Sequence, residues 1–202
     1  MNHATDQRLR TFTAELGLMT VALFVMTFLL LGSLTPGFHL LTDYISRLGA
    51  RGAPFETAWN LIGFGTVGVG LAVFGWCFGL VAHDRILGAC LTVAGLGFAL
   101  RAAPTDFADA EATLSKVHYA SICLALAGFC GALARLTRGG ANDPAARKEA
   151  TMAVALVIFP IVACGAGLCT EPIAHRAILA VVLGWVWLNA FRIWPTEACR
   201  SG

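Results

Sequence analysis

Long apolar segments constrain this chain more than any other feature of its sequence. A helix needs roughly 20 apolar residues to cross the hydrocarbon core of a bilayer. Stretches of about this length occur at Leu16–Leu34, Thr57–Ala82, Ile86–Ala103, Lys116–Leu136, Thr151–Cys169 and Ala177–Trp194. The sequence therefore predicts an all-α integral membrane protein, a bundle of six transmembrane helices that forms a single domain over residues 1–202.

The composition agrees with this fold class. Hydrophobic residues make up 57% of the 202 residues and charged residues 13%, whereas soluble domains carry roughly 25% charged residues. The excess apolar surface must face lipid, which excludes a soluble enzyme and a disordered chain. A net charge of only +2 offers no basic surface for nucleic acid. Membrane lipids are the expected partners.

The distribution of Lys and Arg predicts the orientation. The first apolar stretch follows Arg8 and Arg10 and has no small-x-small cleavage site after it, so we interpret it as a retained signal anchor. With the N-terminus in the cytoplasm, the inner side receives nine basic residues: Arg8, Arg10, Arg85, Arg135, Arg138, Arg147, Lys148, Arg192 and Arg200. The outer side receives five: Arg47, Arg51, Arg101, Lys116 and Arg176. Both termini are therefore expected in the cytoplasm, with the bundle in a bacterial inner membrane.

Small residues follow one spacing in the second, third and fourth stretches. They lie at offsets 0, 4, 7 and 11: Gly68, Ala72, Gly75 and Gly79; then Gly88, Thr92, Gly95 and Ala99; then Ser121, Ala125, Gly128 and Ala132. This spacing keeps them on one helix face, and helices in lipid associate closely through such faces. We expect these three helices to pack together. The same faces leave self-association open.

Polar residues gather in the first outer loop. Over Phe38–Leu48 the apolar residues recur at helical spacing, with Asp43, Ser46 and Arg47 on the opposite face. This pattern predicts a short amphipathic helix. Asp43 and Arg47 either form a plain ion pair four residues apart, or the helix folds over the mouth of the bundle.

The other two outer loops add ionisable groups. Asp106 precedes His118, which lies just inside the fourth apolar stretch and shares its small-residue face. An ionisable side chain at such a depth is a functional candidate; otherwise it is a neutral histidine bonded to a neighbouring helix. Glu171 and Arg176 belong to the third outer loop. Loops of a small bundle converge, so these groups are expected to form one polar cluster.

These residues carry a family resemblance. The stretch Asp43-Tyr44-Ile45-Ser46-Arg47-Leu48-Gly49-Ala50 resembles the hallmark of the bacterial and archaeal domain of unknown function 998 family. Pro104-x-Asp106 followed by His118, and Arg176 before a last span with Trp185 and Trp187, are similar to its other motifs. The resemblance implies a polytopic membrane protein without an established activity.

Two functions fit the polar cluster. We favour a non-enzymatic lipid-binding or assembly protein, in which paired polar groups close the outer end of the bundle. The alternative is a metal-dependent hydrolase or transferase acting on lipid at the outer surface. No cofactor is fixed by the sequence, but Asp43, Asp106 and His118 are the candidate ligands of a zinc ion. Ser46 or Glu171 would then orient water, and Arg176 would hold a lipid phosphate.

Overall fold

The computed structural model describes residues 3–109, 111–140 and 144–194, and over these it contains helices and no strand. The long helices are α1 (His3–Leu34), α3 (Val67–Val81), α4 (Arg85–Leu100), α5 (Thr113–Arg135), α6 (Pro144–Gly165) and α7 (Glu171–Ile193). The shorter elements are η1 (Ile45–Gly49), α2 (Glu56–Ala58), η2 (Trp59–Thr66) and η3 (Leu136–Gly140). α2, the π-helical η2 and α3 follow one another without a break. Arg200 lies outside the described residues.

Most of these helices are long and apolar enough to cross a membrane. Five stretches of the described chain qualify: Ala4–Leu34, Glu56–Val81, Thr113–Gly139, Pro144–Gly165 and Glu171–Ile193. α4 is apolar but has only 16 residues, or about 24 Å at 1.5 Å per residue. That is shorter than the roughly 30 Å hydrocarbon core. The predicted all-α membrane class is confirmed, whereas the sixth crossing stays a prediction.

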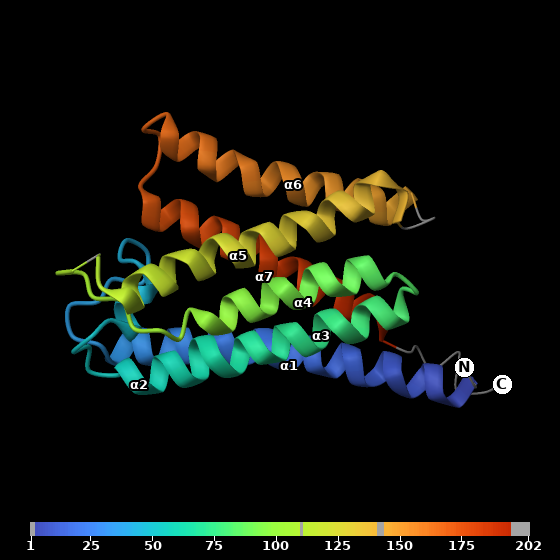
Figure 1. The fold of residues 1–202 in the computed structure, drawn as a ribbon, viewed down its shortest axis with the longest axis horizontal. Coiled ribbons are helices and arrows are strands. Elements are labelled where there is room, and N and C mark those ends of the chain that lie inside the picture. The colour runs from blue at the N-terminus through green and yellow to red at the C-terminus, as the bar shows by residue number, and fades with distance from the viewer. Residues whose placement is uncertain (1–2, 110, 141–143, 195–202) are drawn as a thin grey trace.

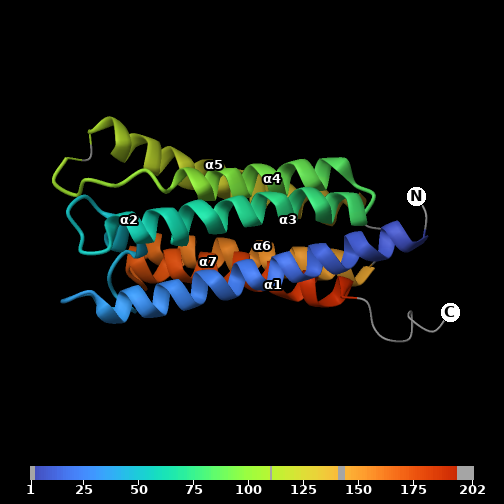
Figure 2. The same cartoon turned by 90° about the horizontal axis from the view of Figure 1, so that it is seen from below.

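The helices lie along one common axis and alternate in direction (Figure 1). α1 begins and α7 ends at the same end of the bundle, and the connecting residues 35–55, 101–109 and 166–170 gather at the opposite end. α3, α4 and α5 form one side, with α1, α6 and α7 on the other (Figure 2). The three loops predicted to converge therefore do so.

Glycines bring α3, α4 and α5 into backbone contact. A Cβ atom on Gly95 of α4 would lie 2.2 Å from the backbone nitrogen of Ala72 in α3. One on Gly128 of α5 would lie 2.5 Å from the nitrogen of Ala94 in α4. No larger residue fits such distances, so the predicted packing through small residues is confirmed. These faces are occupied within the chain, and self-association stays a prediction.

An aromatic cluster joins three helices near the loop end. Trp59 of η2 packs edge-on against Phe24 of α1 and Phe64 of η2, with ring centroids 5.7 and 5.3 Å apart. Phe64 in turn lies 5.7 Å from Phe98 of α4. All four rings are buried. Since aromatic rings have few rotamers, the cluster fixes Phe64 and Phe98 beneath the loops.

The first outer loop differs from the prediction. No amphipathic α-helix covers Phe38–Leu48; the segment makes turns as far as Asp43 and then the 3-10 helix η1. Arg176 is the reason, because its guanidinium binds the carbonyls of Leu40 and Asp43. An α-helix would need those carbonyls for its own bonds at i+4. The backbone N–H of Arg47 instead donates to the carbonyl of Tyr44, 3.0 Å away.

Candidate functional site

His118 lies near the start of α5 and is 2% exposed. Its Nδ1 lies 2.9 Å from the carbonyl oxygen of Arg101 and 3.0 Å from that of Ala103. Both partners only accept, so Nδ1 carries the hydrogen, and in the neutral imidazole Nε2 then keeps its lone pair. Nε2 is buried and has no hydrogen-bond partner among the described residues. His118 is therefore bonded to the segment that directly follows α4 rather than to the helix itself.

Arg101 follows α4 directly and lies on aromatic rings. Its Cζ is 4.8 Å from the ring centroid of Phe64 and 5.4 Å from that of Phe98, which is cation–π geometry. Its Nε is buried and has no hydrogen-bond partner among the residues that the structure describes. Within the described part of the chain, no Asp or Glu forms an ion pair with this guanidinium.

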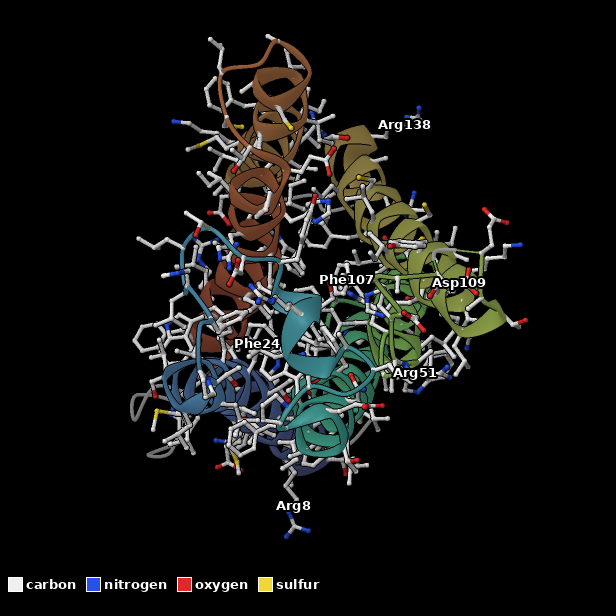
Figure 3. All side chains as sticks on the ribbon, turned by 90° about the vertical axis from the view of Figure 1, so that its left-hand side faces the viewer. Arg8, Phe24, Arg51, Phe107, Asp109 and Arg138 are labelled. Carbon is white, nitrogen blue, oxygen red and sulfur yellow. The ribbon has the colours of Figure 1, made fainter. Side chains whose placement is uncertain are left out.

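Tyr44 links the first loop to α7. Its hydroxyl donates a hydrogen bond to Glu171, and its ring lies 5.8 Å from the ring of His175 and 6.4 Å from that of Phe107. The bond to Glu171 and partial burial stabilise the neutral phenol and raise the pKa of Tyr44 to about 12. Figure 3 looks onto this end, with Phe107 near the centre of the bundle and Arg51 and Asp109 towards its edge.

Asp43 and Arg176 hold the first loop in place. The carboxylate of Asp43 accepts from Arg47 Nη1 and from the backbone N–H of His39, each at 2.8 Å. The predicted ion pair of Asp43 and Arg47 is thus present, while Ser46 of the same segment lines the cavity described below. Arg176 donates Nε to the carbonyl of Leu40 at 2.8 Å, and its other nitrogens donate to the carbonyls of Pro172 and Asp43. Three of the five N–H groups of this guanidinium thus bind backbone carbonyls, and its role in holding phosphate stays a prediction.

Asp106 stabilises the turn before α5. Its Oδ1 accepts from the backbone N–H of Ala108 at 2.9 Å, and its own N–H donates to Ser115 Oγ at 3.0 Å. Its Oδ2 lies 3.8 Å from Arg51 Nη1. These contacts are typical of a carboxylate that orders a loop.

The predicted zinc ligands are engaged separately. Asp43 bonds within the first loop, Asp106 within the second, and His118 with the end of α4. No three His, Cys, Asp or Glu side chains in the described ranges lie together in a way that holds a metal ion. The geometry therefore gives no support to the ligand set Asp43, Asp106 and His118.

A cavity of about 790 Å³ runs from the loop end into the bundle. Its polar end is lined by Tyr44, Ser46, Arg101, His118, Glu171 and His175. Apolar side chains line the rest, among them Leu71, Phe74, Leu126, Phe129, Leu179 and Val186. Of the six residues that the sequence singled out, Ser46, His118 and Glu171 line this cavity, whereas Asp43, Asp106 and Arg176 order the loops around it. An amphiphilic space of this size fits a small amphiphilic molecule.

Sequence reasoning missed Arg101. It counted this residue only as one of the outer positive charges, although Arg101 lies within the predicted stretch Ile86–Ala103. An arginine inside an apolar span is itself a functional signal, and applying that rule here would have found it.

The architecture and the cavity define the class: a polytopic helical membrane protein with an amphiphilic cavity between its helices. Within this class the chain belongs to DUF998, a family of proteins of unknown function, whose pattern matches residues 18–193. The resemblance drawn from the motifs is thereby confirmed, and the matched region contains every residue that lines the cavity. No curated protein and no solved structure matches this chain.

Proposed function

We propose that this protein binds a membrane amphiphile, with the hydrocarbon chain of the ligand between the helices and its head group at the loop end. The observation that carries this proposal is the 790 Å³ cavity, which joins an apolar interior to a polar mouth. Ligand pockets typically measure about 300–1,000 Å³ and combine apolar walls with a few polar groups.

The walls favour hydrocarbon over water. Leu71, Phe74, Phe129 and Val186, which line the inner part, offer no hydrogen bond to water. Water occupies a cavity stably when it finds about three hydrogen-bond partners, and these walls provide none. A chain of methylene groups gains contact with the same side chains, at roughly 0.8 kcal/mol for each buried methylene.

The polar groups are confined to the end where a head group would lie. Tyr44 and Glu171 join the first loop to α7 at the mouth, and Arg176 holds that loop from outside the cavity. Polar contacts between the loops thus shape an opening, which unites the lipid-binding and structural roles expected from the sequence.

The orientation in the membrane completes the proposal. Six helices would cross, with α4 shielded between α3 and α5 so that its shorter length is tolerated. Both termini would lie in the cytoplasm of a bacterial cell, since the basic residues favour that side. The mouth of the cavity would then face outward, and the ligand would come from the outer leaflet.

A matched pair of variants tests the proposal. Leu126 lines the cavity, whereas Leu124, two residues away on α5, is 40% exposed and does not. Leu126→Trp fills part of the cavity, and Leu124→Trp places the same side chain towards lipid. The protein would be reconstituted in phosphatidylcholine nanodiscs, and binding of a fluorescent single-chain alcohol would be measured.

We expect saturable binding of about one alcohol per chain for the wild type and for Leu124→Trp. Leu126→Trp should weaken binding at least about ten-fold, since it competes for the space of several methylenes. Equal binding by the two tryptophan variants, or unsaturable binding by the wild type, would contradict an internal site.

A further inference from the structure

We propose that Arg101 is the anion-binding group of the cavity and that it selects amphiphiles whose head group is a phosphate or a carboxylate. This assignment rests on the proposed function and specifies the chemistry of the ligand. It concerns a residue to which the sequence motifs gave no role.

Arg101 differs from the other cations at its end of the bundle. Arg47, Arg51 and Lys116 pair with Asp43, Asp106 and Glu111, and Arg176 binds backbone carbonyls. For Arg101 the described residues provide two aromatic faces and no carboxylate. Its Nε is buried, and no acceptor in the described ranges binds it.

Arg101 is partly buried, with its Nε shielded from solvent, and a partly desolvated cation without an anionic partner is costly. The rings of Phe64 and Phe98 cover the guanidinium, but a ring face accepts no hydrogen bond of normal strength from its N–H groups. A phosphate or carboxylate arriving through the cavity would accept two such bonds side by side, the geometry for which a planar guanidinium is suited. The gain is larger here than in water, because the guanidinium lies partly buried against the rings of Phe64 and Phe98.

The aromatic cluster makes this group rigid. Phe64 and Phe98 belong to the set of packed rings that includes Phe24 and Trp59. The backbone carbonyl of Arg101 is held by His118 at 2.9 Å. Since both ends of the residue are fixed before a ligand binds, little conformational entropy is lost on binding.

The neighbouring polar groups are compatible with an anion. His118 has a free acceptor at Nε2, which suits a hydroxyl group on the ligand. Glu171 is the acidic side chain among the lining residues, and the hydroxyl of Tyr44 donates to it. That hydrogen bond uses part of the accepting capacity of the carboxylate. Among the described residues, no carboxylate forms an ion pair with Arg101.

The experiment compares ligands with one chain and different head groups. Hexadecyl phosphate, palmitate and uncharged hexadecanol would each displace a fluorescent alcohol from the wild-type protein in phosphatidylcholine nanodiscs. Affinities would be expressed per mole fraction in the nanodisc, so that partitioning is removed. Inorganic phosphate would be added alone to distinguish a free anion from a head group.

Two variants locate the effect. Arg101→Gln removes the charge while keeping polar bulk, and Arg101→Lys keeps the charge without the planar fork. Arg51→Gln is the control, because Arg51 lies at the same end, has a 61% exposed side chain and does not line the cavity. Binding of hexadecanol by each variant reports whether the cavity is still formed.

We expect the wild type and Arg51→Gln to bind both anionic ligands at least about ten-fold more tightly than hexadecanol, as a charged hydrogen bond implies. Arg101→Gln should abolish this preference while still binding hexadecanol, and Arg101→Lys should show an intermediate preference. Equal affinity of the wild type for all three ligands would overturn the role of Arg101 but leave the proposed function intact.

Two other outcomes would also be decisive. If inorganic phosphate displaced the probe as well as hexadecyl phosphate does, the site would belong to a free anion rather than to a lipid head group. If none of the three amphiphiles bound, the proposed function itself would fail. The ligand comparison on the wild type needs no variant, so it stands even if Arg101→Gln does not fold.

Discussion

Gly68 provides the sharpest test of how this bundle is held together. It lies in α3, and a Cβ atom built on it would be 2.2 Å from the backbone nitrogen of Ala99 and 2.4 Å from its Cα. Both atoms belong to the backbone of α4, so no change of rotamer can make room. To restore ordinary contact at 3.4 Å, the two helices would have to separate by about 1.2 Å at this point.

The expected cost of Gly68→Ala follows from this displacement. Overpacking typically costs 1–3 kcal/mol. Because the added Cβ atom meets backbone atoms that cannot move aside, we expect a cost near the upper end, about 3 kcal/mol. Alanine favours the helix over glycine by about 1 kcal/mol. The net loss of stability should therefore be about 2 kcal/mol. Gly184 of α7 is the control, because a Cβ there would have no neighbour within 4 Å, and Gly184→Ala should be neutral or stabilising by up to about 1 kcal/mol.

Both variants would be unfolded with sodium dodecyl sulfate in mixed micelles and followed by near-ultraviolet circular dichroism. Gly68→Ala should unfold at a lower detergent fraction than the wild type, and Gly184→Ala at the same fraction or higher. Ala99 is two residues from Arg101, so Gly68→Ala should also weaken amphiphile binding. Coincident unfolding curves for the two variants would refute the argument that α3 and α4 meet backbone to backbone.

Three further predictions concern single polar contacts. Asp84 caps α4 by accepting from the N–H groups of Ile86 and Leu87, and it pairs with Arg135 at 2.8 Å. In the same unfolding assay, Asp84→Ala should lower the stability by about 3 kcal/mol and Asp84→Asn, which can still cap the helix, by clearly less. Equal losses of stability would show that the cap is unimportant. His118→Leu leaves two carbonyls without their donor and should lower the stability by about 2 kcal/mol. In His118→Asn the amide nitrogen can replace Nδ1, so this variant should recover part of the lost stability. No recovery would contradict the assigned tautomer. The pKa of Tyr44 is raised from 10.0 to about 12, so its stabilising effect is complete below pH 10 and is lost as the pH rises towards about 12. A tyrosinate absorbance titration should show this late component in the wild type but not in Tyr44→Phe. If the additional tyrosine of the wild type instead ionised near pH 10, the bond to Glu171 would be disproved.

The sequence was sufficient for the helices and for their closest contacts. Apolar stretches predicted the long helices because a chain in lipid must satisfy its backbone hydrogen bonds within each segment. The spacing of Gly68, Ala72, Gly75 and Gly79 predicted the packing of α3 against α4 because it is a property of a single helix face. The amphipathic helix over Phe38–Leu48 was wrong because its carbonyls are bound by Arg176, a residue far away in the sequence.

The candidate site was predicted only in part for the same reason. Ser46, His118 and Glu171 do line one cavity, since loops at one end of a small bundle are close together. Asp43 and Asp106 were expected beside His118, but each carboxylate is bound by N–H groups of its own loop. Whether a carboxylate binds N–H groups of its own loop or a ligand depends on competing tertiary contacts, which the amino-acid sequence does not specify.

The amino-acid sequence by itself determined that this chain is helical, belongs in a membrane and is a member of its family, because composition and local spacing act within one helix or one motif. Only the tertiary structure decided which polar groups are already paired and which are not. Arg101 and Arg176 are both outer arginines in the sequence. In the fold, Arg176 is bound by carbonyls from the first loop and from α7, whereas Arg101 rests on two rings within the cavity. That difference arises from how distant segments meet, and the proposed ligand chemistry depends on it.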